Sequence, residues 1–401
     1  MSDYRILHAD VLDGLRSLPY ASVHCVVTSP PYYGLRSYGI DGQLGLEATP
    51  EAYLERMVEV FREVRRVLRP DGTAWVNMGD SYAGSWGNYG ARDGKQRTVS
   101  EERYERPGYD NHKSRPPASY TGPGLPKPKD LLMMPARLAL ALQADGWWLR
   151  SDIIWCKRAP MPESVTDRPT SAHEHIFLLN KAERYFYDAD AVRLELAPAT
   201  IERERSGYSH AFASQFRGSP IDERHPNGKV TEAVSNRAGR NLWNYWLLSP
   251  EPLAMAHFAT FPTEIPRRAI LAGTSERGVC PECGAPWKRV VERSGGTTGN
   301  GWHDHTDDLG LGQRKPKEPI PYKRESTGWA PTCRHAHTDT IPATVLDPFA
   351  GAGTTLLVAQ RLGRRSVGIE LNAEYVQMAH KRIQGDEKAM NMHMDLREAT
   401  V

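Results

Sequence analysis

The chain has 401 residues, which exceeds the length of one typical domain and predicts two or three modules or one large α/β core with insertions. Its formal net charge is +2, so overall charge neither supports nor excludes a nucleic acid as partner. The amino terminus lacks an apolar signal core, and no apolar run approaches the roughly 20 residues that span a bilayer, which excludes a membrane partner and predicts a cytoplasmic protein.

The first 80 residues alternate between strand-like and helix-like patterns. Strands are expected at 4–8, 23–27 and 73–78, and helices at 11–18 and 50–68, where apolar residues recur at helical spacing. This β-α-β alternation is typical of a sheet covered by helices.

The alternation resumes after residue 130. The expected elements are a helix at 131–142, strands at 147–156 and 175–179, a helix at 263–272 capped by Thr263, a strand at 344–346, a helix at 354–362, a strand at 366–369 and a last helix capped by Asn372. Two polar stretches, 84–129 and 195–241, have no sustained period. We expect the first to be a functional loop or disordered, and the second is again polar and irregular. The predicted fold class is α/β, a doubly wound, mostly parallel, Rossmann-like sheet with inserted segments.

The first candidate site is Ser29-Pro30-Pro31-Tyr32, which follows the apolar strand at 23–27. Two prolines remove two amide donors and keep the segment out of helices and ladders, so its carbonyls remain available to a ligand. A serine hydroxyl, a carbonyl and an aromatic face at a strand's carboxyl end suit a flat group with an exocyclic amine, such as a nucleobase. The alternative is a strand that merely ends in a proline turn.

The second candidate site is the glycine-rich turn at 347–353 between a strand and a helix, with Glu370 at the end of the next strand. Such a turn and carboxylate form the nucleotide-binding arrangement of a doubly wound sheet. Asp347 would repel a pyrophosphate but attract a methylsulfonium or an ammonium group, which favours S-adenosylmethionine over a dinucleotide. A glycine-rich turn alone is often only a tight turn.

These stretches resemble the motifs of the DNA amino-methyltransferases, whose members form N4-methylcytosine or N6-methyladenine. Ser-Pro-Pro-Tyr at 29–32 is similar to motif IV, Asp-Pro-Phe at 347–349 with its small-residue turn to motif I, and 257–262 to motif X. The catalytic motif precedes the cofactor motif, as in the β group of the family. The resemblance covers parts of 4–81, 131–180 and 257–383 and leaves the segments between them unmatched.

The resemblance implies a cofactor site for S-adenosylmethionine. The cofactor half needs a third strand, and 4–8 is the only unassigned candidate, so we expect the two ends of the chain to be neighbours, with Asp10 accepting from the adenine amine or the ribose. The expected cofactor-binding residues are Asp10, Thr28, Phe261, Pro262, Asp347, Pro348, Phe349, Gly351, Gly353, Thr354, Thr355 and Glu370.

The same resemblance implies direct methyl transfer to a base that has been flipped out of double-stranded DNA. Ser29 Oγ and the Pro30 carbonyl would accept the amine hydrogens, and Tyr32 would stack on the base. Members with serine at the first position of motif IV are more often cytosine-N4 enzymes, so the Ser-Pro-Pro-Tyr form favours cytosine N4. The alternatives are adenine N6, a methyltransferase of RNA or protein, and a catalytically silent DNA-binding protein.

A Cys-x-x-Cys knuckle at 280–283 is followed by a glycine that permits the tight turn of zinc ribbons. Cys333 and either His335 or His337 would complete a tetrahedral Cys3His site, and the set we favour is Cys280, Cys283, Cys333 and His335. The metal would be structural, tying together the loop at 288–324, which we expect to lack a core of its own. A redox pair or unpaired surface thiols are the alternatives.

The expected partners are double-stranded DNA and, as a candidate, a cognate restriction endonuclease of a restriction-modification system, with the protein a monomer or a dimer. The expected organisation is a catalytic half of the core at 1–83, a flexible insertion at 84–130, continued core at 131–194, a target-recognition region at 195–250, a cofactor motif at 251–279, a zinc-ribbon-like insertion at 280–340 and the cofactor-binding half at 341–401.

Overall fold

The computed structural model describes residues 3–34, 42–83, 126–127, 129–160, 162–195, 239–251, 261–294, 323–336 and 338–398. The chain divides into two compact units. The first comprises 1–187, 243–286 and 335–401, and the second comprises 188–242 and 287–334. Most of the expected insertion at 84–130, most of the expected target-recognition region and His337 lie outside the described residues.

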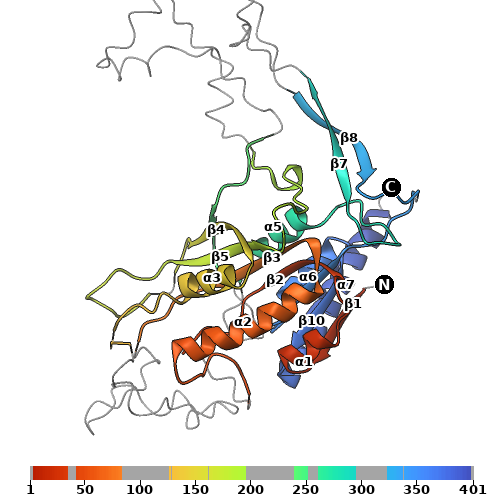
Figure 1. The fold of residues 1–401 in the computed structure, drawn as a ribbon. Helices are drawn as coiled ribbons and strands as arrows, with labels where there is room; N and C mark the ends of the chain where they lie inside the picture. The colour runs from red at the N-terminus through yellow and green to blue at the C-terminus, as the bar shows by residue number, and fades with distance from the viewer. Residues whose placement is uncertain are drawn as a thin grey trace, which may run out of the picture. The chain divides into compact units, whose positions relative to one another are not determined.

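An eight-stranded sheet forms the centre of the first unit (Figure 1). Its strands are, in spatial order, β1 (Tyr4–His8), β10 (Arg365–Glu370), β9 (Thr344–Asp347), β2 (Val23–Thr28), β3 (Leu68–Met78), β5 (His173–Asn180), β4 (Trp148–Lys157) and β6 (Tyr245–Leu248). All neighbouring strands are parallel except that β5 is antiparallel to both β3 and β4. The expected mostly parallel, doubly wound α/β fold is confirmed.

Strand direction decides which chain segments meet. The carboxyl ends of β1, β10, β9, β2, β3, β4 and β6 lie at one edge of the sheet, together with the amino end of β5. As expected, β1 pairs with β10 in parallel register, from Tyr4 opposite Ser366 to His8 opposite Glu370. The first strand of the chain therefore completes the half of the sheet that is formed by its last strands.

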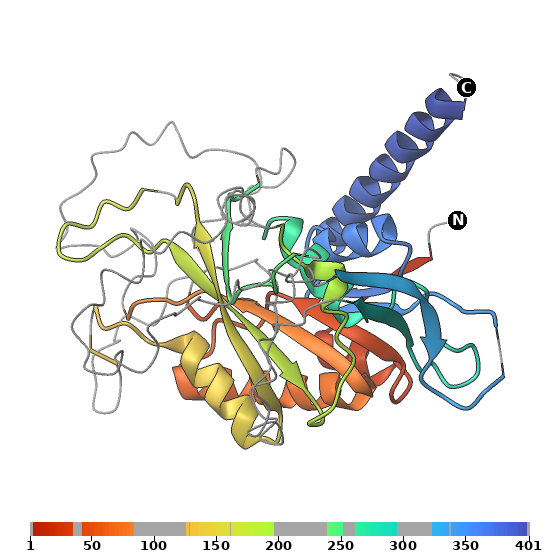
Figure 2. The same ribbon diagram turned by 90° about the horizontal axis from the view of Figure 1, so that it is seen from above.

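Helices cover both faces of this sheet (Figures 1 and 2). One group is α1 (Val11–Arg16), α2 (Pro50–Val67) and α3 (Met134–Ala144), and the other is α5 (Glu264–Gly273), α6 (Thr354–Arg361) and α7 (Ala373–Glu398). The first group buries an apolar stripe that includes Tyr53, Met57 and Phe61 of α2 and Leu138 of α3. Burial of these large side chains from water is the main force that fixes the helices on the sheet.

The helix ends confirm the expected cap at Asn372, correct the one at Thr263 and add a cap at Asp10 that was not predicted. Asp10 accepts a hydrogen bond from the Leu12 amide at 2.8 Å, and Asn372 accepts one from the Glu374 amide at 2.8 Å. Thr263 does stand at the N-cap of α5, but its hydroxyl donates to Glu251 at 2.9 Å and makes no bond to the helix. The helix expected at 131–142 begins at Met134. Met133 before it has φ 54°, a left-handed conformation that an α-helix does not contain.

The second unit contains an antiparallel ribbon of β7 (Trp287–Ser294) and β8 (Lys323–Pro331). The expectation of a coreless loop across 288–324 was therefore wrong at its two ends, while 295–322 lie outside the described residues. Two arginines of the ribbon are paired with acids of the same unit. Arg289 contacts Asp188 at 3.1 Å and Arg324 contacts Asp190 at 2.6 Å, so both guanidinium charges are partly neutralised.

No helix in the described part of the chain combines the length and the apolar character that crossing a membrane requires.

Candidate active site

A cavity of about 1010 Å³ opens at the carboxyl edge of the sheet in the first unit. Its walls come from the segments that leave adjacent strands: Asp10 after β1, Glu370 at the end of β10, Asp347 at the end of β9 and Ser29 after β2. The other half is formed by β3, β4 and β5 through Asn77, Lys157 and Glu174. The edge where parallel strands end is the usual place for a ligand in an open α/β sheet.

The Ser-Pro-Pro-Tyr segment is held in place from behind. The Pro31 carbonyl accepts a hydrogen bond from the Tyr53 hydroxyl of α2 at 2.9 Å, and the Tyr33 carbonyl accepts one from Ser81 at 3.1 Å. Within the described residues we find no donor to the Pro30 carbonyl. The prolines prevent the segment from extending the ladder of β2, so its polar groups face the cavity.

A network of polar side chains links Ser29 to the opposite wall of the cavity. The Ser29 hydroxyl donates to the Tyr32 hydroxyl at 3.3 Å, and the Tyr32 hydroxyl donates to Glu174 Oε2 at 2.6 Å. Asn77 Nδ2 donates to the Tyr32 hydroxyl and to Glu174 Oε2, each at 2.8 Å. Lys157 Nζ contacts Glu174 Oε1 at 2.6 Å. Burial, and then the neighbouring Glu174 charge, raise the pKa of Tyr32 well above its usual value, so its phenol keeps its proton.

The other half of the cavity is lined by two carboxylates. Asp347 is 1% exposed and accepts hydrogen bonds from the Thr28 hydroxyl at 2.7 Å and the Phe349 amide at 3.1 Å. Burial raises the pKa of Asp347 to about 6 despite these bonds. Glu370 accepts from the amides of Gly351 and Asn372, each at 2.8 Å, and burial raises its pKa as well. Each carboxylate would be more stable with a cation or further donors beside it.

Most of the expected site residues meet at this cavity, and four do not line it. Its walls include Asp10, Ser29, Pro30, Pro31, Tyr32, Phe261, Asp347, Pro348, Phe349, Gly351, Thr354 and Glu370. The four others support it from behind. Thr28 bonds to Asp347, Thr355 donates to the Val27 carbonyl at 3.1 Å, and Pro262 is buried. Gly353 has φ +73°, and a Cβ there would lie 2.9 Å from Ala379, so it lets α6 and α7 approach each other.

Three residues of the network were not expected from the sequence: Asn77, Lys157 and Glu174. Asn77 interrupts the apolar run of β3 and is only 3% exposed, and a lone amide in a buried strand is a usable signal because buried polar groups need partners. Lys157 and Glu174 lie at strand ends in no motif that the sequence reading recognised. Only the antiparallel pairing of β4 with β5 brings them together.

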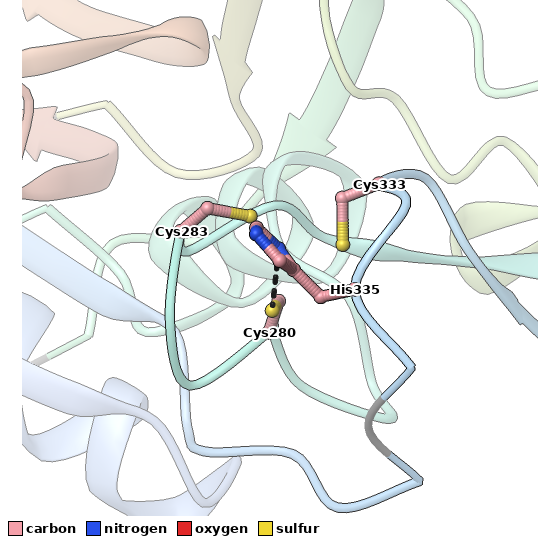
Figure 3. A group of neighbouring side chains, drawn as sticks. All are labelled: Cys280, Cys283, Cys333 and His335. Atoms are coloured by element: carbon pink, nitrogen blue, oxygen red, sulfur yellow. Dashed lines mark hydrogen bonds between the residues drawn. The ribbon is translucent and has the colours of Figure 1, made fainter.

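The expected Cys/His cluster forms at a distance from the cavity. Figure 3 shows Cys280, Cys283, Cys333 and His335 pointing toward one another, and their candidate ligand atoms all lie within 4.8 Å of one another. Cys280 Sγ lies 3.6 Å from His335 Nδ1. In a tetrahedral zinc site with bonds of about 2.3 Å, ligand atoms are roughly 3.8 Å apart. Three thiols and an imidazole at this spacing fit a zinc ion.

The knuckle of this cluster is attached to the amino ends of β2 and β9. His24, at the start of β2, donates from Nε2 to the Gly284 carbonyl and accepts at Nδ1 from the Thr344 amide, each at 3.0 Å. Arg69 donates to the Cys283 carbonyl at 2.7 Å. Gly284 has φ +69°, and a Cβ there would lie 2.7 Å from Arg69 Nη1, which explains the glycine. Burial, and then Arg69, lower the pKa of His24 to about 4, which keeps the ring neutral.

The chain is similar in sequence to a family of known proteins. Residues 23–280 and 340–381 match the DNA methylase family (N6_N4_Mtase). The chain is 37% identical over 382 residues to the type II methyltransferase M.Cfr9I of Citrobacter freundii. The alignment covers 95% of this chain and 88% of that protein. It is 34% identical over 379 residues to the type II methyltransferase M.SmaI of Serratia marcescens, and the alignment covers 94% of this chain and 90% of that protein. Among solved structures, the cytosine-N4-specific PvuII DNA methyltransferase superposes with a TM-score of 0.49 at 15% identity. The superposition covers 96% of this chain and 92% of that one.

Proposed function

The chain belongs to the DNA methylase family, and from this premise we propose that it transfers a methyl group from S-adenosylmethionine to the N4 amine of a flipped cytosine in double-stranded DNA. The observation that carries the proposal is the single cavity that joins Ser29 and its two prolines to Asp347 and Glu370. A volume of about 1010 Å³ is large enough for a cofactor and a base side by side.

The carboxylate half of the cavity is the proposed cofactor site. Asp347 would attract the cationic part of the cofactor, and Glu370 would accept from the ribose hydroxyls. Two buried carboxylates whose pKa values are raised support this assignment, because a cation and hydroxyl donors would relieve the cost of their burial. Bound here, S-adenosylmethionine supplies an electrophilic methyl group.

The Ser-Pro-Pro-Tyr half is the proposed base site. The exocyclic amine of cytosine is a poor nucleophile because its lone pair is delocalised into the ring. Ser29 Oγ and the Pro30 carbonyl would accept its two hydrogens and favour tetrahedral nitrogen, with the lone pair directed at the methyl group. Tyr32 lines the cavity and would hold the plane of the base.

Serine at position 29 favours cytosine N4 over adenine N6 as the methylated atom. Identifying the methylated nucleoside in the product DNA distinguishes the two. Purified protein, unmethylated genomic DNA and S-adenosylmethionine would be incubated, and the DNA digested to nucleosides for mass spectrometry. N4-methylcytosine is the expected product. N6-methyladenine would keep the mechanism but overturn the assignment of the base, and an absence of methylated nucleosides would overturn the proposed function.

We also propose that Cys280, Cys283, Cys333 and His335 hold one structural zinc ion. The chemistry of the donors supports this, because three thiolates and an imidazole satisfy a tetrahedral ion and leave no position open for a substrate. The anchors His24 and Arg69 lie at the amino ends of the strands, whereas the cavity lies at their carboxyl ends. A metal here would stabilise the fold and take no part in methyl transfer.

A further inference from the structure

In the polar network that includes Ser29, the chemistry of the groups fixes which one donates and which one accepts in each hydrogen bond. An ionised carboxylate only accepts hydrogen bonds, so the 2.6 Å contact between Tyr32 and Glu174 requires the phenol to donate. The phenol oxygen then accepts, and Asn77 Nδ2 and the Ser29 hydroxyl both donate to it, at 2.8 and 3.3 Å. The single hydroxyl hydrogen of Ser29 is thus engaged by the Tyr32 oxygen and is not offered to a ligand.

Lys157 determines the charge of the far end of this network. Its ammonium group lies 2.6 Å from Glu174 Oε1, and both side chains are mostly buried, at 23% and 13% exposed. The Glu174 carboxylate accepts from the Lys157 ammonium, the Tyr32 phenol and Asn77 Nδ2. The chain of hydrogen bonds from Ser29 through Tyr32 to Glu174 therefore runs in one direction only.

We propose that Glu174, Lys157 and the Tyr32 hydroxyl are positioning residues that hold Ser29 as a hydrogen-bond acceptor for the exocyclic amine. This inference rests on the proposed function and adds the reason why Ser29 accepts, since a free serine hydroxyl can equally donate. An inward hydrogen on Ser29 would oppose the amine hydrogens and remove one of the two acceptors that shape the nucleophile. In this role the three residues act through Ser29, although their side chains also line the cavity.

Glu174→Gln should reverse the donor and acceptor roles of the hydrogen bonds from residue 174 to Ser29 without changing the shape of the side chain. The Lys157 ammonium can only donate, so it would retain the amide oxygen of the new side chain and turn its amino group toward Tyr32. The phenol would then donate to Ser29, whose hydrogen would turn into the cavity. Asn77 Oδ1 is buried and has no hydrogen-bond partner among the residues that the structure describes, so the Asn77 amide can rotate to accept from the new glutamine.

The decisive variant is Glu174→Gln combined with Lys157→Met. Without the ammonium group, the glutamine can present its oxygen to Tyr32 and restore the original direction. In single-turnover methyl transfer with saturating cofactor, Glu174→Gln should lower the rate constant by about 100-fold, in the range typical of a lost acid–base or positioning group. The double variant should recover about tenfold of that loss.

The matched control is Asp152→Asn on β4, a carboxylate that bonds to His175 at 2.9 Å and does not line the cavity. Its rate constant should stay within about twofold of the wild type, because substitutions away from a site have small effects. Cofactor affinity, measured by calorimetry, should be unchanged in all variants and verifies that each is folded. Should Glu174→Gln fail to fold, Tyr32→Phe keeps the aromatic ring and should lower the rate constant by at least about tenfold.

The outcomes separate this inference from the proposed function. A wild-type protein that transfers no methyl group to DNA would overturn the proposed function and the inference with it. An active wild type with Glu174→Gln or Tyr32→Phe within about threefold of it would overturn the inference alone, as would a double variant no faster than Glu174→Gln.

Discussion

The two edges of the central sheet show two ways of using polar side chains. At the carboxyl edge, Asp347, Glu370 and the polar network that includes Ser29 line a cavity large enough for a ligand. At the amino edge, three thiols and an imidazole point toward one another and are fixed to the strands through His24 and Arg69. A site for a ligand leaves its polar groups incompletely satisfied, whereas a structural site completes its own ligand set.

The largest effect that would sharpen this comparison is the removal of the metal that we propose for the amino edge. Free zinc at a thousand times its Kd stabilises a folded protein by about 4 kcal/mol, so a chelator should lower the Tm of a chain of this length by roughly 5 °C. Differential scanning calorimetry with and without the chelator, together with metal analysis, measures this. Cys283→Ser should give protein with little zinc and the same low Tm.

The comparison also requires that methyl transfer survive the loss of the metal. At temperatures well below its Tm, the chelated protein should retain a single-turnover rate constant within about threefold of the zinc-loaded protein. A loss of transfer in protein that is still folded would place the metal in the catalytic machinery, and zinc-free protein with an unchanged Tm would contradict the structural role.

A smaller effect tests the carboxylate at the other edge. Asp347→Asn should weaken cofactor binding by on the order of 30-fold, about 2 kcal/mol, because it removes a charged partner of the cofactor. The pKa of Asp347 is raised to about 6, and a cation favours its ionised form, so wild-type affinity should increase as pH rises toward 6 and level off above 7. Calorimetry from pH 5 to 8 measures both.

The asparagine variant should lose this pH dependence as well as affinity. The exposed acid Asp13 of α1 offers a control, and Asp13→Asn should bind the cofactor within about twofold of the wild type. Equal affinities of Asp347→Asn and wild type at pH 7.5 would exclude Asp347 from the cofactor site.

The smallest effect concerns the anchor of the amino edge. The pKa of His24 is lowered from 6.5 to about 4, so between these values the unfolded chain binds a proton that the folded chain does not. Stability should therefore fall as pH falls from 6.5 to 4 and change no further, through this group, at lower pH. The loss at pH 5 should be on the order of 1 kcal/mol, allowing for the solvent contact of the ring.

Denaturant unfolding of the wild type and His24→Gln at pH 5 and 7 measures that loss. The glutamine can still donate and accept but does not titrate, so its pH dependence should be shallower by this amount. Identical pH dependence in the two proteins would mean that His24 is not kept neutral by its surroundings.

The sequence predicted most helices and strands of the central sheet, but it missed a ribbon and assigned one capping bond wrongly. The need for a third strand in the cofactor half correctly placed Tyr4–His8 beside β10, because residues 4–8 were the one strand pattern not yet assigned to either half. The ribbon of β7 and β8 was missed because its charged residues hide the two-residue period of a strand. Thr263 was assigned a capping bond that its hydroxyl makes instead with Glu251, 12 residues away in the chain.

The candidate site was predicted where it consists of contiguous motifs and missed where it depends on pairing. Ser29, Asp347 and Glu370 each stand at the end of an apolar run, so strand direction alone brings them to one edge. Lys157 and Glu174 meet only because β4 and β5 are antiparallel neighbours, and no local pattern in the sequence specifies that pairing.

The most direct test of the account is the single-turnover rate constant of methyl transfer to DNA by Ser29→Ala, measured beside its affinity for S-adenosylmethionine. If the carboxyl edge carries the chemistry as described, the rate constant should fall by at least about 100-fold while the cofactor Kd stays within about twofold, because only the acceptor for the amine is lost. A rate constant within about threefold of the wild type would contradict the assignment of the reaction to this cavity wall.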